Sequence, residues 1–332
     1  MVNSDRPTMH DVAAAAGVSQ MTVSRVLRGD GYFSEDVKKR VAEAAAKLGY
    51  IHNRLASVQR GMKNPMIGVV LPTLKNHVFT DVLAGINDTL SEMNMRPVFG
   101  VSEYSEAAEE TLVRDMLSWQ PSGLILSGLE HTEGLKRAVK QSGARVAEIM
   151  DADGVPIAAS FGISQESAGT DMAQHFLEKG HMKVAYLGSQ GGGDLRALKR
   201  YNAFRETLSA GGGEVIYERV SKAPSSMTLG RDLAATCLQK VTDCDAIYCA
   251  NDDLAAGVLM HCITHGVSVP GQIALAGFND LPFLAALPQQ ITTTHTPLYE
   301  MGVRAAKYVA LETPDEPPQE ALKTRLVVGD TT

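Results

Sequence analysis

Residues 8–27 have the sequence TMHDVAAAAGVSQMTVSRVL, which predicts two short helices joined by a tight turn at Gly17. Thr8 and Asp11, three positions apart, can satisfy free backbone N–H groups where the first helix begins. Gly17 suits the left-handed backbone of the turn, and Ser19 is a good N-cap for the second helix. The stretch therefore predicts a helix-turn-helix.

The second helix is predicted to present a mostly polar surface, formed by Gln20, Met21, Thr22, Ser24 and Arg25. In a helix-turn-helix this helix enters the DNA major groove, so the predicted partner is double-stranded DNA. Glutamine can pair with adenine, arginine with guanine, and methionine can contact a thymine methyl group. Because one such helix contacts few base pairs, we expect a homodimer on a palindromic operator.

A third helix is expected from about Ser34 to Leu48, ended by Gly49, and it would complete a three-helix headpiece over residues 1–52. Residues 53–65 are then expected to form one or two helical turns and a linker rich in helix breakers. From residue 66 onward, short apolar strands alternate with longer amphipathic segments. This rhythm predicts a parallel α/β sheet, with too many strands for one compact sheet.

These motifs resemble the LacI/GalR family of repressors. The resemblance rests on DVAAAAGVS, TVSRVL and LGYI in the headpiece and continues through IGVVLPTLKNHVF, CANDDLAAGVL and VPGQIALAGFNDLP. It implies a periplasmic-binding-protein-like (type I) sensor domain over 66–332, made of two parallel-sheet subdomains. We place the first subdomain at about 66–160 and 291–320, and the second at about 161–290 and 321–329.

The resemblance also implies which residues contact DNA. Ser24, Thr22, Asn53 and Arg28 are expected at phosphates, and the full set is Thr8, Ser19, Gln20, Met21, Thr22, Ser24, Arg25, Arg28, Asn53, Arg54, Leu55, Ala56 and Gln59. In the family, a leucine near the end of the hinge helix wedges into the minor groove, and Gln59 stands at that position here. Either the kink is smaller, or Val58 or Leu55 takes this role, or Gln59 contacts a base edge. The plain alternative is that residues 53–60 are only a linker.

Ligands of parallel sheets bind beyond the carboxyl ends of the strands, so the loops there predict an effector site. Matching the family's motifs gives Lys75, Asn76, Phe79, Asp151, Arg196, Arg200, Tyr248, Asn251, Asp252 and Asn279. Many relatives carry an aspartate where Asn279 stands. Arg196, Lys199 and Arg200 lie about one helical turn apart and could bind a carboxylate, although Arg196 and Lys199 could equally face solvent. A sugar or sugar acid is the expected effector, since QMTVSRVLR, MLSW and EIMD most resemble the gluconate-responsive repressors of the family.

Composition agrees with this interpretation. The net charge of the 332 residues is −7, but residues 1–63 hold ten Lys and Arg against six Asp and Glu, a net +4 that leaves −11 elsewhere. Four cysteines without a C-x-x-C pair, and no long apolar run, predict a reduced cytoplasmic, nucleoid-associated protein without a membrane partner. His261 and His265 share a helix face, but two imidazoles alone predict no metal site.

We predict no cofactor and no enzyme, because GSQGGG fits no nucleotide-binding fingerprint and no catalytic motif is present. The leading prediction is a ligand-responsive repressor. Two alternatives stay open: a cytoplasmic sugar-binding or sugar-modifying protein with a vestigial headpiece, and a constitutive architectural DNA binder without an effector.

Overall fold

The structure is a computed structural model that describes residues 6–51, 64–189, 193–311 and 316–332. The chain divides into two compact units, Met1–Asn64 and Pro65–Thr332, and each is described by itself. We call them the headpiece and the sensor domain. In the part of the chain that the structure describes, no helix has the length and apolar character needed to cross a membrane.

The headpiece has three helices, α1 (Met9–Ala16), α2 (Gln20–Arg28) and α3 (Glu35–Leu48). Their ends are fixed by the local signals expected from the sequence. Thr8 and Asp11 form a reciprocal capping box, while Ser19 and Ser34 cap α2 and α3. Gly17 adopts φ 64°, which lets the chain turn from α1 into α2. The helix-turn-helix prediction is confirmed.

A small apolar core holds the three helices together. Its buried residues recur at helical spacing along the three helices. They are Val12, Ala13, Ala16, Val23, Val41, Ala44 and Ala45. The side chain of Arg40 also donates to the carbonyl oxygen of Ala16 at 3.2 Å, linking α3 to the end of α1. The exposed side chains of α2 are not part of this core.

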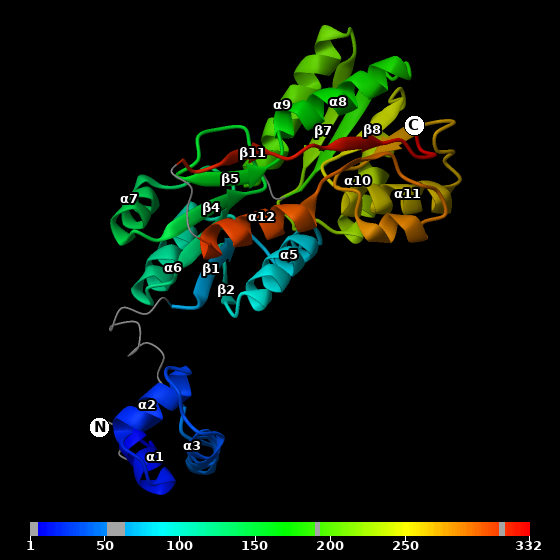
Figure 1. The fold of residues 1–332 in the computed structure, drawn as a ribbon. Helices are drawn as coiled ribbons and strands as arrows, with labels where there is room; N and C mark the ends of the chain where they lie inside the picture. Colours follow the sequence, from blue (N-terminus) through cyan, green and yellow to red (C-terminus); the bar gives the residue numbers. More distant parts are fainter. Residues whose placement is uncertain (1–5, 52–63, 190–192, 312–315) are drawn as a thin grey trace. The chain divides into compact units, whose positions relative to one another are not determined.

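The sensor domain contains a six-stranded, all-parallel first sheet in the order β11-β5-β4-β3-β1-β2 (Figure 1). Its strands are β1 (Met66–Leu71), β2 (Arg96–Val101), β3 (Gly123–Ser127), β4 (Arg145–Ile149), β5 (Ala159–Gly162) and β11 (Gln319–Ala321). Helices α5 (Val78–Glu92) and α12 (Leu298–Ala310) pack in one core with this sheet, and α6 (Glu106–Ser118) and α7 (Glu133–Ser142) pack in another. The sheet is therefore covered on both faces.

The second sheet is parallel in the order β7-β6-β8-β9. Its strands are β6 (Lys183–Gly188), β7 (Glu214–Val220), β8 (Ala246–Cys249) and β9 (Ala274–Ala276). The helices paired around it are α8 (Gln165–Glu178) with α9 (Leu195–Ala210) and α10 (Met227–Lys240) with α11 (Asp252–His265). One large apolar core joins these elements. The expected pair of parallel α/β subdomains is confirmed.

Short segments connect the two sheets. After β9 comes the 3₁₀ helix η2 (Pro282–Ala286) and then β10 (Thr293–His295), which pairs antiparallel with β12 (Arg325–Val327). Between β10 and β12, the chain returns to the first sheet as α12 and β11 (Figure 1). The carboxyl ends of strands from both sheets consequently contribute loops to the cleft described below.

Helices α7 and α12 and strand β5 are not among the elements expected from the sequence. Helix α7 spans only ten residues between two strands. Its boundaries do carry local signals, because Thr132 caps its start and Gly143 ends it at φ 67°. Strand β5 is four residues long, too short for a clear alternation of apolar and polar residues.

Candidate functional site

The first candidate site is the exposed surface of α2. Gln20 and Arg25 are exposed, and 72% of Met21 is accessible, which is unusual for a large apolar side chain. Ser19 accepts a hydrogen bond from the backbone N–H of Thr22 at 3.1 Å and holds the helix start in place. Three side chains with different base-recognition chemistry thus share the exposed part of one helix.

Ser24 corrects the expected outward surface. It is only 6% exposed, and its buried hydroxyl has no hydrogen-bond partner within the described residues. Ser24 follows Val23 of the headpiece core and lies about one turn before Leu27, which packs against that core, so its position borders the buried face of α2. The Nε of Arg28 donates to the carbonyl oxygen of Ser24 at 3.1 Å. Arg28 also pairs with Asp30 at 3.3 Å. The two positively charged residues of α2 therefore differ in their ion pairs. Arg28 pairs with a carboxylate, whereas no carboxylate of the described residues pairs with Arg25.

Thr8, at the start of α1, is occupied in capping. Its hydroxyl donates to the carboxylate of Asp11 at 2.7 Å, and its backbone N–H donates to the same carboxylate at 2.7 Å. The hydrogen bonds from Thr8 lower the pKa of Asp11. The five predicted hinge residues, Asn53, Arg54, Leu55, Ala56 and Gln59, lie outside the described residues.

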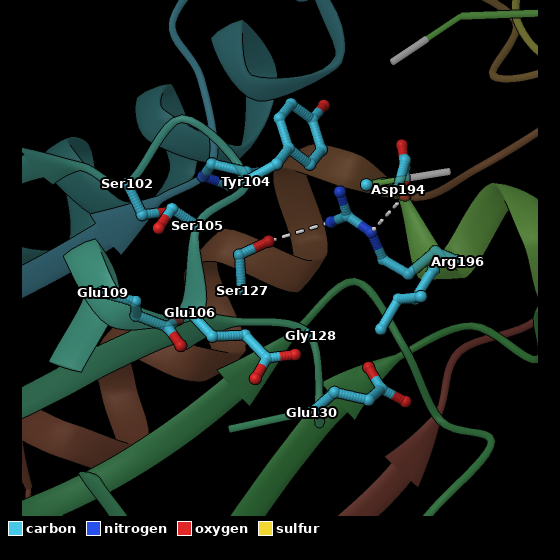
Figure 2. A pocket seen from close by; sticks show the side chains of 13 residues that line it. Ser102, Tyr104, Ser105, Glu106, Glu109, Ser127, Gly128, Glu130, Asp194 and Arg196 are labelled. Carbon is cyan, nitrogen blue, oxygen red and sulfur yellow. Dashed lines mark hydrogen bonds and ion pairs between the residues drawn. The ribbon is translucent and has the colours of Figure 1, made fainter. Parts of the chain in front are cut away.

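The second candidate site is a cleft between the loops of the two sheets. It consists of two adjoining cavities of about 180 and about 40 Å³ that share Tyr104, Asp194 and Arg196. The larger cavity, seen in Figure 2, is lined by the loop after β2, the first turn of α6, the end of β3 with the loop that follows it, and the start of α9. Its lining residues include Ser102, Glu106, Glu109, Ser127 and Glu130. The smaller cavity is lined by residues that include Asn76, Gln165, Arg200, Asn251, Phe278 and Asn279.

Helix α9 supplies two buried arginines to this cleft. Arg196 donates from Nη1 to the hydroxyl of Ser127 at 2.9 Å, and its Nε lies 3.2 Å from a carboxylate oxygen of Asp194 (Figure 2). Burial lowers the pKa of Arg196, but the neighbouring Asp194 and Tyr104 outweigh burial and raise it. The guanidinium of Arg196 is therefore charged and neutralised by a carboxylate.

Arg200 has a different environment. It is 5% exposed, donates from Nη2 to the carbonyl oxygen of Ala250 at 2.8 Å, and also donates to the side chain of Gln165. Its guanidinium lies 3.5 Å from the centre of the Phe278 ring. Among the described residues no carboxylate forms an ion pair with Arg200. The Arg200 charge helps to lower the pKa of Asp194, whose direct ion pair is with Arg196. A buried guanidinium without a direct carboxylate partner favours an anionic ligand.

Lys199 connects the two subdomains across the cleft. Its ammonium lies 2.6 Å from a carboxylate oxygen of Asp151 and 2.6 Å from one of Glu130, both in loops of the first sheet. Burial raises the pKa of Asp151, and Lys199 only partly offsets this effect. Burial also acts to raise the pKa of Glu130, but Lys199 outweighs it and leaves that pKa lowered.

Two asparagines complete the smaller cavity. The side-chain oxygen of Asn251 accepts from the backbone N–H of Leu254 at 3.1 Å and from the hydroxyl of Ser225 at 2.9 Å, so its amide nitrogen remains available. Asn279 is buried with φ 118°, a strained conformation for a residue other than glycine. Its side chain makes no hydrogen bond to another described residue.

The structure brings Asn76, Arg196, Arg200, Asn251 and Asn279 together at the cleft. The other predicted residues are placed differently, and we describe them in turn. Lys75 is exposed, and Asp151 is paired with Lys199. Phe79 is buried in the core of the first sheet, with the Arg196 guanidinium 5.7 Å from its ring centre.

Tyr248 and Asp252 belong to the interior of the second subdomain. Burial raises the pKa of Tyr248, and the nearby Arg200 acts against this shift. Asp252 accepts from the hydroxyl of Thr293 at 2.7 Å and from the backbone N–H of Leu281 at 2.9 Å. Burial raises the pKa of Asp252 to about 7, although these two hydrogen bonds lower it. Asp252 thereby links the start of α11, next to Asn251, to the segment that follows Asn279.

Tyr104 and Gln165 line the cleft but were not predicted from the sequence. Tyr104 follows Glu103 after β2, and both residues have positive φ, at 61° and 51°. Burial and Asp194 raise the pKa of Tyr104 to about 12, although Arg196 and Asn76 act to lower it. A tight turn of two residues other than glycine after a strand gives no strong sequence signal.

His261 and His265 stack with ring centres 4.0 Å apart. In the described part of the chain, no group of three or more His, Cys, Asp and Glu side chains could hold a metal ion.

Comparison with known proteins agrees with this architecture. The family described as "Bacterial regulatory proteins, lacI family" matches residues 8–53, and "Periplasmic binding protein-like domain" matches residues 173–332. The chain is 37% identical over 303 residues to the HTH-type transcriptional regulator GntR of Pseudomonas aeruginosa, covering 91% of this chain and 88% of that protein.

Two solved structures are similar. A LacI family transcriptional regulator from Silicibacter pomeroyi has a TM-score of 0.92 and 39% identity, covering 98% of this chain and 99% of that one. The transcription regulator GntR from Chromobacterium violaceum has a TM-score of 0.74 and 34% identity, covering 80% of this chain and 98% of that one.

Proposed function

The chain belongs to the LacI family of bacterial regulatory proteins, and we propose from this premise that it is a ligand-responsive repressor. It binds a palindromic operator as a homodimer, and a sugar acid similar to gluconate in the cleft changes its affinity for DNA. Coupling between two such sites is reciprocal, so ligand and operator weaken each other by the same factor when they favour different states of the dimer.

The observation that supports an acidic effector is the charge balance of α9. Arg196 is neutralised by Asp194, and Lys199 is neutralised by Asp151 and Glu130. Arg200 alone among these three has no direct ion pair with a carboxylate of the described residues, and it lies at the smaller cavity beside Asn251 and Asn279. A carboxylate on the ligand supplies the missing charge, while the two amides suit the ligand's hydroxyl groups.

Asn279 strengthens this argument. The resemblance to the family implies an aspartate at the matching position in many members, where a carboxylate would accept hydrogen bonds from sugar hydroxyls. An amide at Asn279 removes one negative charge from the cleft and adds a donor. Both differences favour an anion over a neutral sugar. The likeness to regulators printed as GntR agrees with a gluconate-like ligand.

Thermal unfolding with D-gluconate and D-glucose tests the ligand. Gluconate is expected to raise the Tm of the wild type more than glucose does, and Arg200→Gln removes this difference. Arg205→Gln, an exposed arginine of the same helix stacked on Tyr201, is the matched control and keeps it. Because Arg200→Gln alters a buried residue, Asn279→Asp is the second variant, and its added charge weakens the response to gluconate without removing Arg200.

Selection from a randomised pool of two-fold DNA sites at about 0.15 M salt tests the regulator. Enrichment of a palindrome that gluconate abolishes supports an inducible repressor. Enrichment that requires gluconate makes the ligand a co-repressor. Gluconate binding without any enriched DNA favours the sugar-binding alternative with a vestigial headpiece, and enrichment that no sugar acid affects favours the architectural DNA binder.

A further inference from the structure

The guanidinium of Arg25 lies between two residues of the loop that follows α2. Its Cζ is 5.5 Å from the centre of the Phe33 ring. On the other contact, a Cβ at Gly31 would lie 3.2 Å from Cζ of Arg25 and 2.5 Å from its Nη2, which is closer than real Cβ contacts come, so the flexible end of the Arg25 side chain would have to shift. Gly31 has φ +95°, so the loop also requires its backbone freedom. A side chain at position 31 would therefore displace the guanidinium of Arg25 from this place.

This arrangement is separate from the packing that folds the headpiece. Phe33 is partly buried, but it is not one of the residues in the headpiece core. Arg25 is exposed, and no carboxylate of the described residues pairs with it. Ring stacking uses the face of the guanidinium and leaves the N–H groups on its edge free to donate. A guanine offers its O6 and N7 atoms to that same edge.

We propose that Phe33 and Gly31 are positioning residues that hold Arg25 ready to recognise a guanine. The inference rests on the proposed function, because it requires Arg25 to contact a base. A free arginine side chain loses much rotational freedom on binding, and a side chain already held in place loses less. The loop after α2 thus contributes to sequence discrimination without contacting the base itself.

The test uses two duplexes. One is the palindrome that the full-length wild type enriches from the randomised pool, and the other carries A·T in place of the G·C pair at which Arg25→Ala loses discrimination. The measured quantity is the ratio of the two Kd values. Phe33→Leu and Gly31→Ala are expected to lower this ratio roughly two- to tenfold.

Three variants control the result. Phe33→Tyr keeps an aromatic ring and is expected to keep the wild-type ratio, as is Tyr32→Leu, which removes the fully exposed neighbouring ring. Gly29→Ala imposes similar backbone strain at φ +75°, but a Cβ there meets nothing within 4 Å, so it also keeps the ratio. In an Arg25→Ala background, Phe33→Leu is expected to change the ratio no further.

A purely structural role for Phe33 would give another pattern. If Phe33→Leu weakened binding to both duplexes by the same factor, or still lowered the ratio without Arg25, the inference would be overturned while the proposed function stood. If the wild type enriched no duplex at all, the proposed function would be overturned as well.

Discussion

Gly169 of α8 lies so close to Arg200 of α9 that a Cβ at residue 169 would be 2.1 Å from the backbone carbonyl oxygen of Arg200. The absence of a side chain lets the two helices meet at their backbones. This close approach sets the position from which the Arg200 side chain reaches the cleft. The packing of α8 against α9 and the geometry of the cleft therefore depend on the same glycine.

We expect Gly169→Ala to push α9 away from α8 and weaken gluconate binding at least tenfold. Overpacking of this kind costs about 1–3 kcal/mol of stability. The matched control is Gly302→Ala, in α12, where a Cβ would meet the carbonyl oxygen of Val82 at 2.2 Å. Calorimetric titration and urea unfolding should show that both variants lose stability but that only Gly169→Ala loses ligand affinity. Equal losses of affinity would contradict the link to Arg200.

Helix ends and the alternation of strands and helices could be predicted from the sequence because their causes are local. Thr8, Ser19 and Ser34 each lie next to the N–H groups that they cap, and Gly17 marks the turn itself. The ion-pair partners of a charged side chain are not always local in this sense. Lys199 and Arg200 are neighbours on one helix, and only the fold shows that Asp151 and Glu130, far away in the sequence, pair with the first.

The same limit applies to the DNA-binding surface. Arg25 and Arg28 differ by three positions in sequence, but the turn after α2 brings Asp30 to Arg28 and leaves Arg25 beside Phe33. Ser24 is buried at the border of the face that packs in the headpiece core, although its polar side chain favoured the exposed surface. Residue type and spacing thus identified the predicted DNA-binding surface of α2. The burial and ion pairing of each side chain on it depend on contacts beyond the helix.

The Arg28–Asp30 pair predicts a change in the salt dependence of DNA binding. With Asp30→Asn, the Arg28 charge becomes available to phosphate, so log Kd against log salt should steepen by about one. Asp36→Asn makes the same charge change at a carboxylate that pairs with Arg40 on α3, 3.1 Å away, and should leave the slope unchanged. Equal steepening in both variants would show that net charge alone is responsible.

The ion pairs of Lys199 predict a stability effect. Lys199→Met leaves the fully buried Asp151 without its charge partner, and breaking a buried pair costs about 3–5 kcal/mol. Because burial already raises the pKa of Asp151, the variant should be relatively more stable at low pH, where the carboxyl group is neutral. Urea unfolding at pH 5 and pH 8 measures this difference.

Two controls make the Lys199 result specific. Asp151→Asn combined with Lys199→Met removes both charges, so it should recover much of the lost stability and show less dependence on pH. Lys183→Met breaks an exposed pair with Asp243, where the two side chains are 46% and 62% exposed, and should change stability little. A double variant no more stable than Lys199→Met would contradict the role of the buried charge.

His131 predicts a loss of stability at alkaline pH. Its buried ring lies 2.8 Å from Glu109 and 3.4 Å from Glu148. Burial lowers the pKa of His131, but these two carboxylates outweigh burial and raise it to about 9. The folded state therefore binds this proton more tightly than the unfolded state, whose histidine has a pKa near 6.5. The stabilisation of the folded state by protonated His131 is complete below about pH 6.5 and disappears as the pH rises through about 9.

The free energy of unfolding should consequently fall by roughly 3 kcal/mol between these limits in the wild type. His131→Gln is less stable at pH 6 and should lack this decline, while His295→Gln, a partly exposed imidazole beside Asp280, should retain it. Trp119 is the only tryptophan and directly follows α6, the helix that carries Glu109. Its fluorescence in urea therefore reports unfolding of the subdomain that contains Glu109. If the wild type and His131→Gln declined in parallel from pH 6 to 10, the imidazole would be neutral in the folded protein, and Glu109 and Glu148 could not hold it as a cation.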